Sequence, residues 1–336
     1  AQAGRRHRIS PNITYLTASG HESKLDVYQF DDNSSPRETR MFFHGGGWVL
    51  GNVDTHEGMA RAIAQRAGVI VVSVDYRLAP EARFPGAFDD VIAGLQWVGK
   101  NGASVGIDTT RLAIGGDSAG GNLAAVAALW ARDHNGPKLR LQVLAYPVTD
   151  GVARTESYRK FQDGYGLNAP TMEWFFDHYA PSRQERGDWR LSPLRAKSLA
   201  GLPPALVVTA GYDVLRDEGR AYAWRLQQEG TLTDLVKAGK AYVKISATEL
   251  FSTTPPHFAG YQDMARALIA ANPDRILWGT NWPHPGSRPP GHDIAQLLPW
   301  RDIDDAAVLN LLEVWEPSAV VRKKILVDNP ARLFGF

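Results

Sequence analysis

The sequence predicts an α/β protein whose mostly parallel sheet is covered by helices on both faces. Apolar strand-like runs alternate with helix-length segments, which is the pattern of a parallel sheet. Residues 69–74 are rich in β-branched side chains, as is typical of a strand buried on both faces. Residues 111–124 are predicted to form an apolar strand, a glycine-rich turn and an alanine-rich helix. The other elements are organised around this stretch.

The remaining elements follow from the same periodicities. Polar and apolar residues alternate over 11–30, which suits a hairpin or two edge strands. Further strands are predicted at 39–43, 139–146 and 205–210. Helices are predicted at 55–67, 85–100, 171–179 and from about 218 to 228.

The turn at residues 116–120 has the form G-x-S-x-G, with Ser118 at its centre. Such a turn needs small residues because the serine occupies a strained backbone position between a strand and a helix that pass close together. This geometry exposes the serine oxygen and aims the first helical N–H groups at the same point. Ser118 is therefore the candidate nucleophile.

Three adjacent glycines follow the strand at 39–43, in His44-Gly-Gly-Gly-Trp48. Such a run is costly in backbone entropy unless the chain needs unusual dihedral angles or close approach to a ligand. Paired with a serine turn downstream, its N–H groups are candidates for the second half of an oxyanion hole.

Composition narrows the class of protein. The 336 residues are 44% hydrophobic and 22% charged, as is ordinary for a globular protein, and the net charge of +1 implies no nucleic-acid partner. There is no cysteine, which excludes disulfides and thiolate metal sites. The basic start lacks an apolar core segment and no run reaches membrane-spanning length, so we expect a cytoplasmic protein with no membrane partner.

Four motifs in register carry a family resemblance. They are His44-Gly-Gly-Gly-Trp, Tyr76-Arg-Leu-Ala-Pro-Glu, Gly115-Gly-Asp-Ser-Ala-Gly-Gly-Asn and Ala210-Gly-Tyr-Asp-Val-Leu-Arg-Asp-Glu. Over about residues 20–235 the chain resembles the hormone-sensitive-lipase-type (type IV) esterases of the α/β-hydrolase fold. The resemblance implies hydrolysis of small carboxylic esters, usually of short acyl chains, without a cofactor. It assigns Ser118 as nucleophile, Asp213 as triad acid, and the N–H groups of Gly46, Gly47 and Ala119 as the oxyanion hole.

The triad needs a histidine that follows the acid, because α/β-hydrolases present Ser, Asp and His in that chain order. Asp217 and Glu218 compete with Asp213 for the role of acid, but they fall on a first helical turn, where acidic residues are favoured by the helix dipole alone. After Asp213 the chain offers only His257, His284 and His292, and none lies in the family's usual His-Gly-Phe context.

We favour His257 as the base. A strand at about 242–246, a loop, His257 and a helix at 261–271 would repeat the order that the esterase requires, with a longer loop. His284, within Asn-Trp-Pro-His-Pro, is the alternative, and His292 comes after it. The remaining alternative is that the chain has no working base.

From about 237 to 336 the sequence resembles something different, namely the C-terminal end of the amidohydrolase family that includes pyrone-dicarboxylate lactonase. The resemblance is carried by the run 271–285 and by the ending Ile325-Leu-Val-Asp-Asn-Pro-Ala-Arg-Leu-Phe-Gly-Phe. A final fragment cannot close such a barrel. Metal-dependent hydrolysis is disfavoured, because no His-x-His pair occurs and Asn281 replaces the expected aspartate, so we expect no metal site.

The sequence therefore predicts a chimeric chain. Residues 1–235 form an esterase body, with a small cap made from the N-terminus and about 150–192, and residues 236–336 form an amidohydrolase-like segment that partly completes the sheet. The cap aromatics, Tyr165, Trp174, Phe175, Phe176 and Tyr179, either line an acyl pocket or pack the cap onto the body. Two alternative hypotheses are that the chain is an impaired hydrolase that acylates slowly, and that the C-terminal segment is an interaction module. A homodimer is possible.

Overall fold

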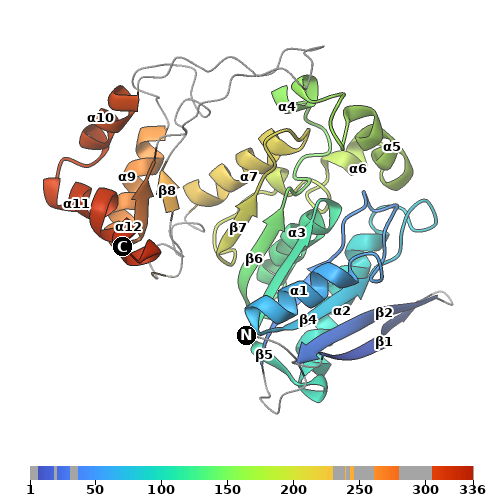
Figure 1. The fold of residues 1–336 in the computed structure, drawn as a ribbon. Coiled ribbons are helices and arrows are strands. Elements are labelled where there is room, and N and C mark those ends of the chain that lie inside the picture. Colours follow the sequence, from blue (N-terminus) through green and yellow to red (C-terminus); the bar gives the residue numbers. More distant parts are fainter. Residues whose placement is uncertain are drawn as a thin grey trace. The chain divides into compact units, whose positions relative to one another are not determined.

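A computed structural model describes residues 7–18, 21–30, 37–229, 239, 243–245, 261–279 and 305–335 of the chain (Figure 1). The chain divides into two compact units, Ala1–Thr231 and Leu232–Phe336. Among the described helices, none combines the length and hydropathy that a membrane-spanning helix needs.

The described part of the N-terminal unit is built on one seven-stranded sheet in the order β1-β2-β4-β3-β5-β6-β7. The strands are β1 (His7–Ala18), β2 (His21–Phe30), β3 (Arg37–Phe43), β4 (Ile70–Asp75), β5 (Ile107–Asp117), β6 (Leu139–Ala145) and β7 (Ala205–Val208). Strands β4, β3, β5, β6 and β7 run parallel, whereas β1 and β2 are antiparallel to their neighbours. Their carboxyl ends therefore meet at one edge, where the loops that follow them gather.

Helices cover both faces of this sheet (Figure 1). One face packs on α2, α3 and α7 and holds the larger core, while α1 covers the other through Ala60 and Ala64. The helical elements of this unit are α1 (Glu57–Ala67), α2 (Gly86–Asn101), η1 (Gly102–Val105), α3 (Ala119–Asp133), α4 (Glu156–Lys160), α5 (Ala169–Tyr179), α6 (Arg183–Gly187), η2 (Pro193–Arg195) and α7 (Arg216–Gln228). The predicted fold class, a mostly parallel sheet with helices on both faces, is confirmed.

The N-terminus differs from the prediction that it forms part of a cap. Its described residues are strands β1 and β2, which extend the sheet. The alternating pattern explains this position, because Leu25 and Val27 of β2 are fully buried in the core while β2 pairs with β4. The hairpin that this alternation also predicts is present.

The described part of the C-terminal unit contains a separate two-stranded parallel sheet, β8 (Val243–Ile245) with β9 (Ile276–Trp278). Its helical elements are α9 (Tyr261–Ala271), η4 (Pro273–Arg275), α10 (Asp305–Trp315), α11 (Ala319–Lys323), η5 (Lys324–Asp328) and α12 (Asn329–Phe334). Ile245, Leu268, Ile276 and Leu312 share a small buried core.

This arrangement corrects the expectation that a strand at about 242–246 continues the esterase sheet. Strand β8 pairs with β9 instead, and Ile245 and Ile276 are both buried in the core of this unit. In the described residues, β7 is the last strand of the large sheet, and its Leu206 and Val208 are 52% and 47% exposed.

Candidate active site

Ser118 lies between β5 and α3 in a backbone conformation that non-glycine residues rarely adopt, with φ 53° and ψ −118°. Its N–H donates to the Ala145 carbonyl over 2.8 Å, and its carbonyl accepts the Asn122 N–H at 3.0 Å. A Cβ atom on Gly116 or Gly120 would overlap the Phe43 carbonyl oxygen. Glycine at these two positions therefore lets the strand and helix pass close to β3, and the surroundings hold the serine in its strained conformation.

The glycine loop after β3 is a tight turn. Gly46, Gly47 and Trp48 have φ values of 107°, 61° and 60° in succession. The Leu50 N–H donates to the Gly46 carbonyl over 2.8 Å, and a Cβ atom on Gly46 would overlap the Leu50 carbonyl. The φ of Gly46 and the nearby Leu50 carbonyl require glycine at that predicted oxyanion-hole position. Gly47 shares its left-handed φ with Trp48, a conformation that residues with a side chain adopt only at a cost.

A side chain of α5 lies against this loop. Phe175 of α5 is almost fully buried, and its ring occupies the space into which a side chain on Gly47 would project. Phe176 and Tyr179 are buried as well, and the Tyr179 ring stacks on Trp48 at 4.9 Å between centroids. Trp174, in contrast, is 44% exposed. Packing thus accounts for Phe176 and Tyr179, whereas Phe175 also borders the glycine loop.

Asp117 joins the serine turn to the glycine loop. Its Oδ1 accepts the Gly45 N–H at 3.1 Å, and its Oδ2 lies 3.6 Å from Nε2 of His56. Burial raises the pKa of Asp117 above its usual value, and the charge of His56 and the Gly45 hydrogen bond oppose the shift. A Cβ atom on Gly45 would overlap this carboxylate, so the contact depends on glycine there.

The buried side chain of His44 contacts the backbone of the glycine loop. Its ring is fully buried, its Nδ1 lies 2.8 Å from the Gly45 carbonyl, and the Tyr76 hydroxyl donates to the His44 carbonyl over 2.7 Å. The two rings stack at 4.3 Å. Burial lowers the pKa of His44 to about 4, so the ring is neutral at pH 7 and Nδ1–H is the donor to Gly45. His44 therefore has a structural role.

Asp213 follows β7, at the same sheet edge as Ser118 and the glycine loop. Its Oδ1 accepts the Leu215 N–H at 2.9 Å, and its Oδ2 has no hydrogen-bond partner within the described parts of the chain. Burial raises the pKa of Asp213 above its usual value. A partly buried carboxylate with one oxygen fixed by backbone and one available suits the acid of a triad.

The two competing carboxylates are engaged elsewhere. Asp217 accepts hydrogen bonds from Arg216 Nε at 2.8 Å and from the Ser157 N–H at 2.8 Å. Glu218 is fully buried and accepts the Thr149 N–H at 2.7 Å. The second oxygen of Glu218, Oε2, has no partner among the described residues either, but it is fully buried, whereas Asp213 is only partly buried.

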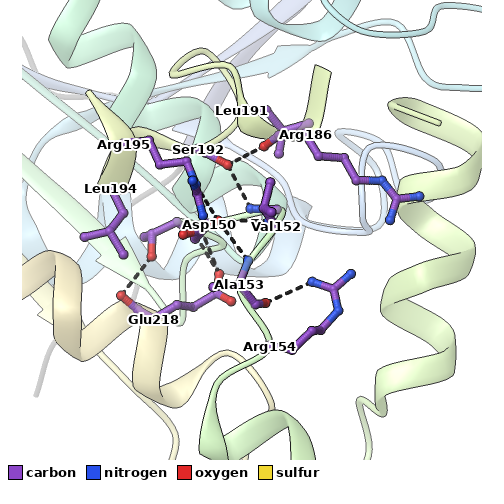
Figure 2. Close-up of polar contacts among 12 residues, drawn as sticks. Asp150, Val152, Ala153, Arg154, Arg186, Leu191, Ser192, Leu194, Arg195 and Glu218 are labelled. Atoms are coloured by element: carbon purple, nitrogen blue, oxygen red, sulfur yellow. Dashed lines mark hydrogen bonds and ion pairs between the residues drawn. The ribbon is translucent and has the colours of Figure 1, made fainter. Parts of the chain in front are cut away.

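Glu218 belongs to a polar network at the start of the predicted cap segment, about residues 150–192 (Figure 2). It also accepts the Asp150 N–H at 3.3 Å, while Asp150 Oδ1 pairs with Arg195 at 2.9 Å and caps the backbone of Val152 at 2.9 Å. Ser192 accepts the Gly151 N–H at 2.8 Å. Burial raises the pKa of Glu218 to about 8, although the backbone hydrogen bonds oppose the shift.

The structure thus brings Ser118, the glycine loop, Ala119 and Asp213 to one sheet edge, as the sequence predicts for residues that follow parallel strands. The candidate bases His257, His284 and His292 lie outside the described residues. Sequence reasoning missed the contacts of Asp117 and His56, because a short motif carries no signal for a partner in a distant loop. Among the described residues, no group of three or more His, Asp or Glu could hold a metal ion.

Comparison with known proteins identifies the family. The α/β hydrolase fold family matches residues 40–242. The carboxylic ester hydrolase LipN of Mycobacterium tuberculosis is 46% identical over 270 residues, which cover 78% of this chain and 71% of that protein. The ethyl acetate hydrolase of Pseudomonas putida is 40% identical, covering 67% and 71%.

The chain belongs to the α/β-hydrolase family. A solved thermostable esterase from Pseudomonas putida superimposes on this α/β-hydrolase with a TM-score of 0.63 at 43% identity, covering 68% of this chain and 71% of that one. The hyperthermophilic esterase of Pyrobaculum calidifontis gives 0.62 at 40% identity, covering 67% and 71%. These relatives confirm the predicted enzyme class, carboxylic ester hydrolase, at the level of the family.

The C-terminal resemblance is confirmed as well, because residues 173–336 of this α/β-hydrolase match the amidohydrolase family. The match includes the whole C-terminal unit, Leu232–Phe336. The α/β-hydrolase match ends at residue 242, before each of the three candidate histidines.

Proposed function

We propose that this α/β-hydrolase cleaves short-chain carboxylic esters through Ser118, Asp213 and a histidine of the C-terminal segment, with His257 as the first candidate and His284 as the alternative. The observation that carries the proposal is the backbone of Ser118, whose φ of 53° at the junction of β5 and α3 is that of an exposed nucleophile. Strain of this kind persists only where the surroundings impose it.

In the proposed mechanism, Ser118 attacks the ester carbonyl while the histidine takes its proton. The N–H groups of Gly46, Gly47 and Ala119 stabilise the oxyanion, and Asp213 orients the histidine. The histidine then protonates the departing alkoxide, and a water molecule, deprotonated by the same histidine, hydrolyses the acyl-enzyme. The free oxygen of Asp213 and the close approach of Phe175 to Gly47 support this assignment and a narrow acyl site.

The test compares p-nitrophenyl acetate, butyrate and octanoate turnover by the parent chain, Ser118→Ala, Asp213→Asn, His257→Ala and His284→Ala. We expect Ser118→Ala and His257→Ala to lose about 10³-fold or more in kcat, and octanoate to be the poorest substrate. Asp217→Asn is the matched control for Asp213→Asn, because Asp217 is engaged by Arg216 and Ser157. If His257→Ala is near normal and His284→Ala is inactive, the base is His284.

A second candidate function is slow acylation without turnover. It is favoured by the end of the α/β-hydrolase match at residue 242, which leaves His257, His284 and His292 in sequence of another family. Such a chain would release at most one equivalent of p-nitrophenol per Ser118 in a burst, and sustained release would exclude it.

A further inference from the structure

The Asp117 carboxylate is held between two segments that are distant in sequence. Its Oδ1 accepts the N–H of Gly45, which is 72 residues away and directly precedes the two oxyanion-hole glycines. Its Oδ2 faces Nε2 of His56 at 3.6 Å. Both side chains are largely shielded from solvent, with 12% of Asp117 and 19% of His56 exposed. An electrostatic interaction between groups shielded in this way is screened less by solvent than one between surface residues.

His56 is itself oriented by a turn. Thr55 Oγ1 lies 2.9 Å from Nδ1 of His56 and 2.8 Å from the Asn52 carbonyl oxygen. The hydroxyl has one proton. If the hydroxyl donates this proton to the Asn52 carbonyl, the Thr55 oxygen must accept a proton from Nδ1–H of His56. Nε2 then faces the carboxylate favourably only when it also carries a proton, that is, in the imidazolium form. If the hydroxyl proton goes to Nδ1, the neutral ring carries its proton on Nε2. Both states therefore direct an Nε2–H toward Asp117.

We propose that His56 is a positioning residue for ester hydrolysis: it holds the Asp117 carboxylate in the orientation that accepts the Gly45 N–H, and so keeps the glycine loop in place to stabilise the oxyanion. The inference rests on the proposed function for its kinetic consequence. The contact itself is a matter of structure and is measurable without turnover.

Three substitutions of His56 separate this role from simple packing. Gln places its amide N–H where Nε2 stood and can still donate to Asp117. Asn places its amide where Nδ1 stood, so it keeps the Thr55 contact and loses Asp117, and Ala loses both. We expect kcat for p-nitrophenyl butyrate to fall about tenfold in His56→Asn and His56→Ala and to stay within about threefold in His56→Gln, with KM within about twofold throughout, because the loop acts on the oxyanion of the transition state.

The partner is tested in a double-mutant cycle. In an Asp117→Asn background, the His56→Ala change should lower kcat no further, because the charge that His56 faces is already gone. His134→Gln is the control: His134 is exposed, bonds to the Trp130 carbonyl at 3.0 Å and stacks on the Trp130 ring, so parent activity is expected.

The readout that needs no turnover is the backbone amide resonance of Gly45 in an ¹⁵N-labelled chain. We expect His56→Ala to move this resonance and to speed its hydrogen exchange, and His134→Gln to leave both unchanged. An unmoved Gly45 amide in His56→Ala, equal kcat in His56→Asn and His56→Gln, or a loss in His56→Ala as large as in Ser118→Ala each overturns the proposal. A parent chain that never turns over refutes the proposed function, while the Gly45 amide still decides whether the contact exists.

Discussion

The Asp117 carboxylate accepts the Gly45 N–H at 3.1 Å, so the residue before the serine is bonded to the residue before the two proposed oxyanion-hole glycines. The two halves of the predicted site, the serine turn and the glycine loop, therefore form one unit. Because Asp117 is largely buried, this bond has little competition from water. The geometry of the site consequently depends on side chains that carry out no chemistry themselves.

The first prediction concerns the strain at Ser118. Ser118→Gly should be more stable than Ser118→Ala by about 1 kcal/mol, because glycine adopts a φ of 53° without a Cβ penalty while alanine keeps that penalty. Both variants should be inactive. Urea unfolding monitored by tryptophan fluorescence measures the difference. Equal midpoints would mean that the serine backbone is relaxed.

The second prediction concerns Gly47. Gly47→Ala should lower kcat by about 10²-fold, because the new methyl group meets the Phe175 ring and displaces an oxyanion donor. It should also destabilise the fold by about 1–3 kcal/mol, since the φ of 61° strains alanine.

Gly58 of α1 supplies the matched control. A Cβ atom there would meet nothing within 4 Å, and the residue is helical. Gly58→Ala should stabilise the chain by about 0.5–1 kcal/mol and leave kcat unchanged. A Gly47→Ala variant as active as Gly58→Ala would contradict the place of Gly47 in the oxyanion hole.

The third prediction concerns Glu218, whose pKa burial raises to about 8 from a usual value of 4.5. The folded state binds this proton more tightly than the unfolded state, so its contribution to stability is present below pH 4.5 and is lost as the pH rises toward 8. Glu218→Gln mimics the protonated form. Between pH 5.5 and 7.5 the free energy of unfolding of the variant, minus that of the parent, should increase by about 1 kcal/mol per pH unit.

The measurement is a series of urea midpoints across this range, with Glu81→Gln as the surface control because Glu81 is exposed. A constant difference between Glu218→Gln and the parent would show that Glu218 stays charged in the folded state.

The fourth prediction separates the core of the sheet from its edge strand. Leu144→Ala should destabilise the chain by about 2–5 kcal/mol, because Leu144 is fully buried in the core. Leu206→Ala on β7 should change stability by less than about 0.5 kcal/mol, because half of its side chain is exposed. Chemical unfolding of both variants gives the comparison. A large loss of stability in Leu206→Ala would show that the side chain of Leu206 on β7 is covered.

The sequence predicts much of the fold and the candidate site because their determinants are local. The β-branched run at 69–74 becomes β4, and the apolar spacing of 171–179 becomes α5. Gly46 and the glycines around Ser118 lie where a side chain would overlap the neighbouring backbone, so the serine turn and the glycine loop can be recognised from the sequence.

Partners across the fold are a different matter. A three-residue strand such as β8 pairs with whichever edge lets its apolar face be buried, and for Ile245 that is the edge of β9. The alternation of β2 predicts a half-buried strand but not that its neighbour is β4, which draws the N-terminus into the sheet rather than a cap.

By itself, the sequence determined the α/β architecture, the nucleophile candidate Ser118, the glycine loop and the composite nature of the chain, because each depends on a local pattern or motif. Only the tertiary structure decided that Asp117 bonds to Gly45 and that His56 faces Asp117. It also decided that Asp217 is engaged by Ser157, that Glu218 is fully buried, and that one oxygen of the partly buried Asp213 is available. The physical reason is that a hydrogen bond or an ion pair is specified by two positions in space, and a linear sequence records only one of them at a time.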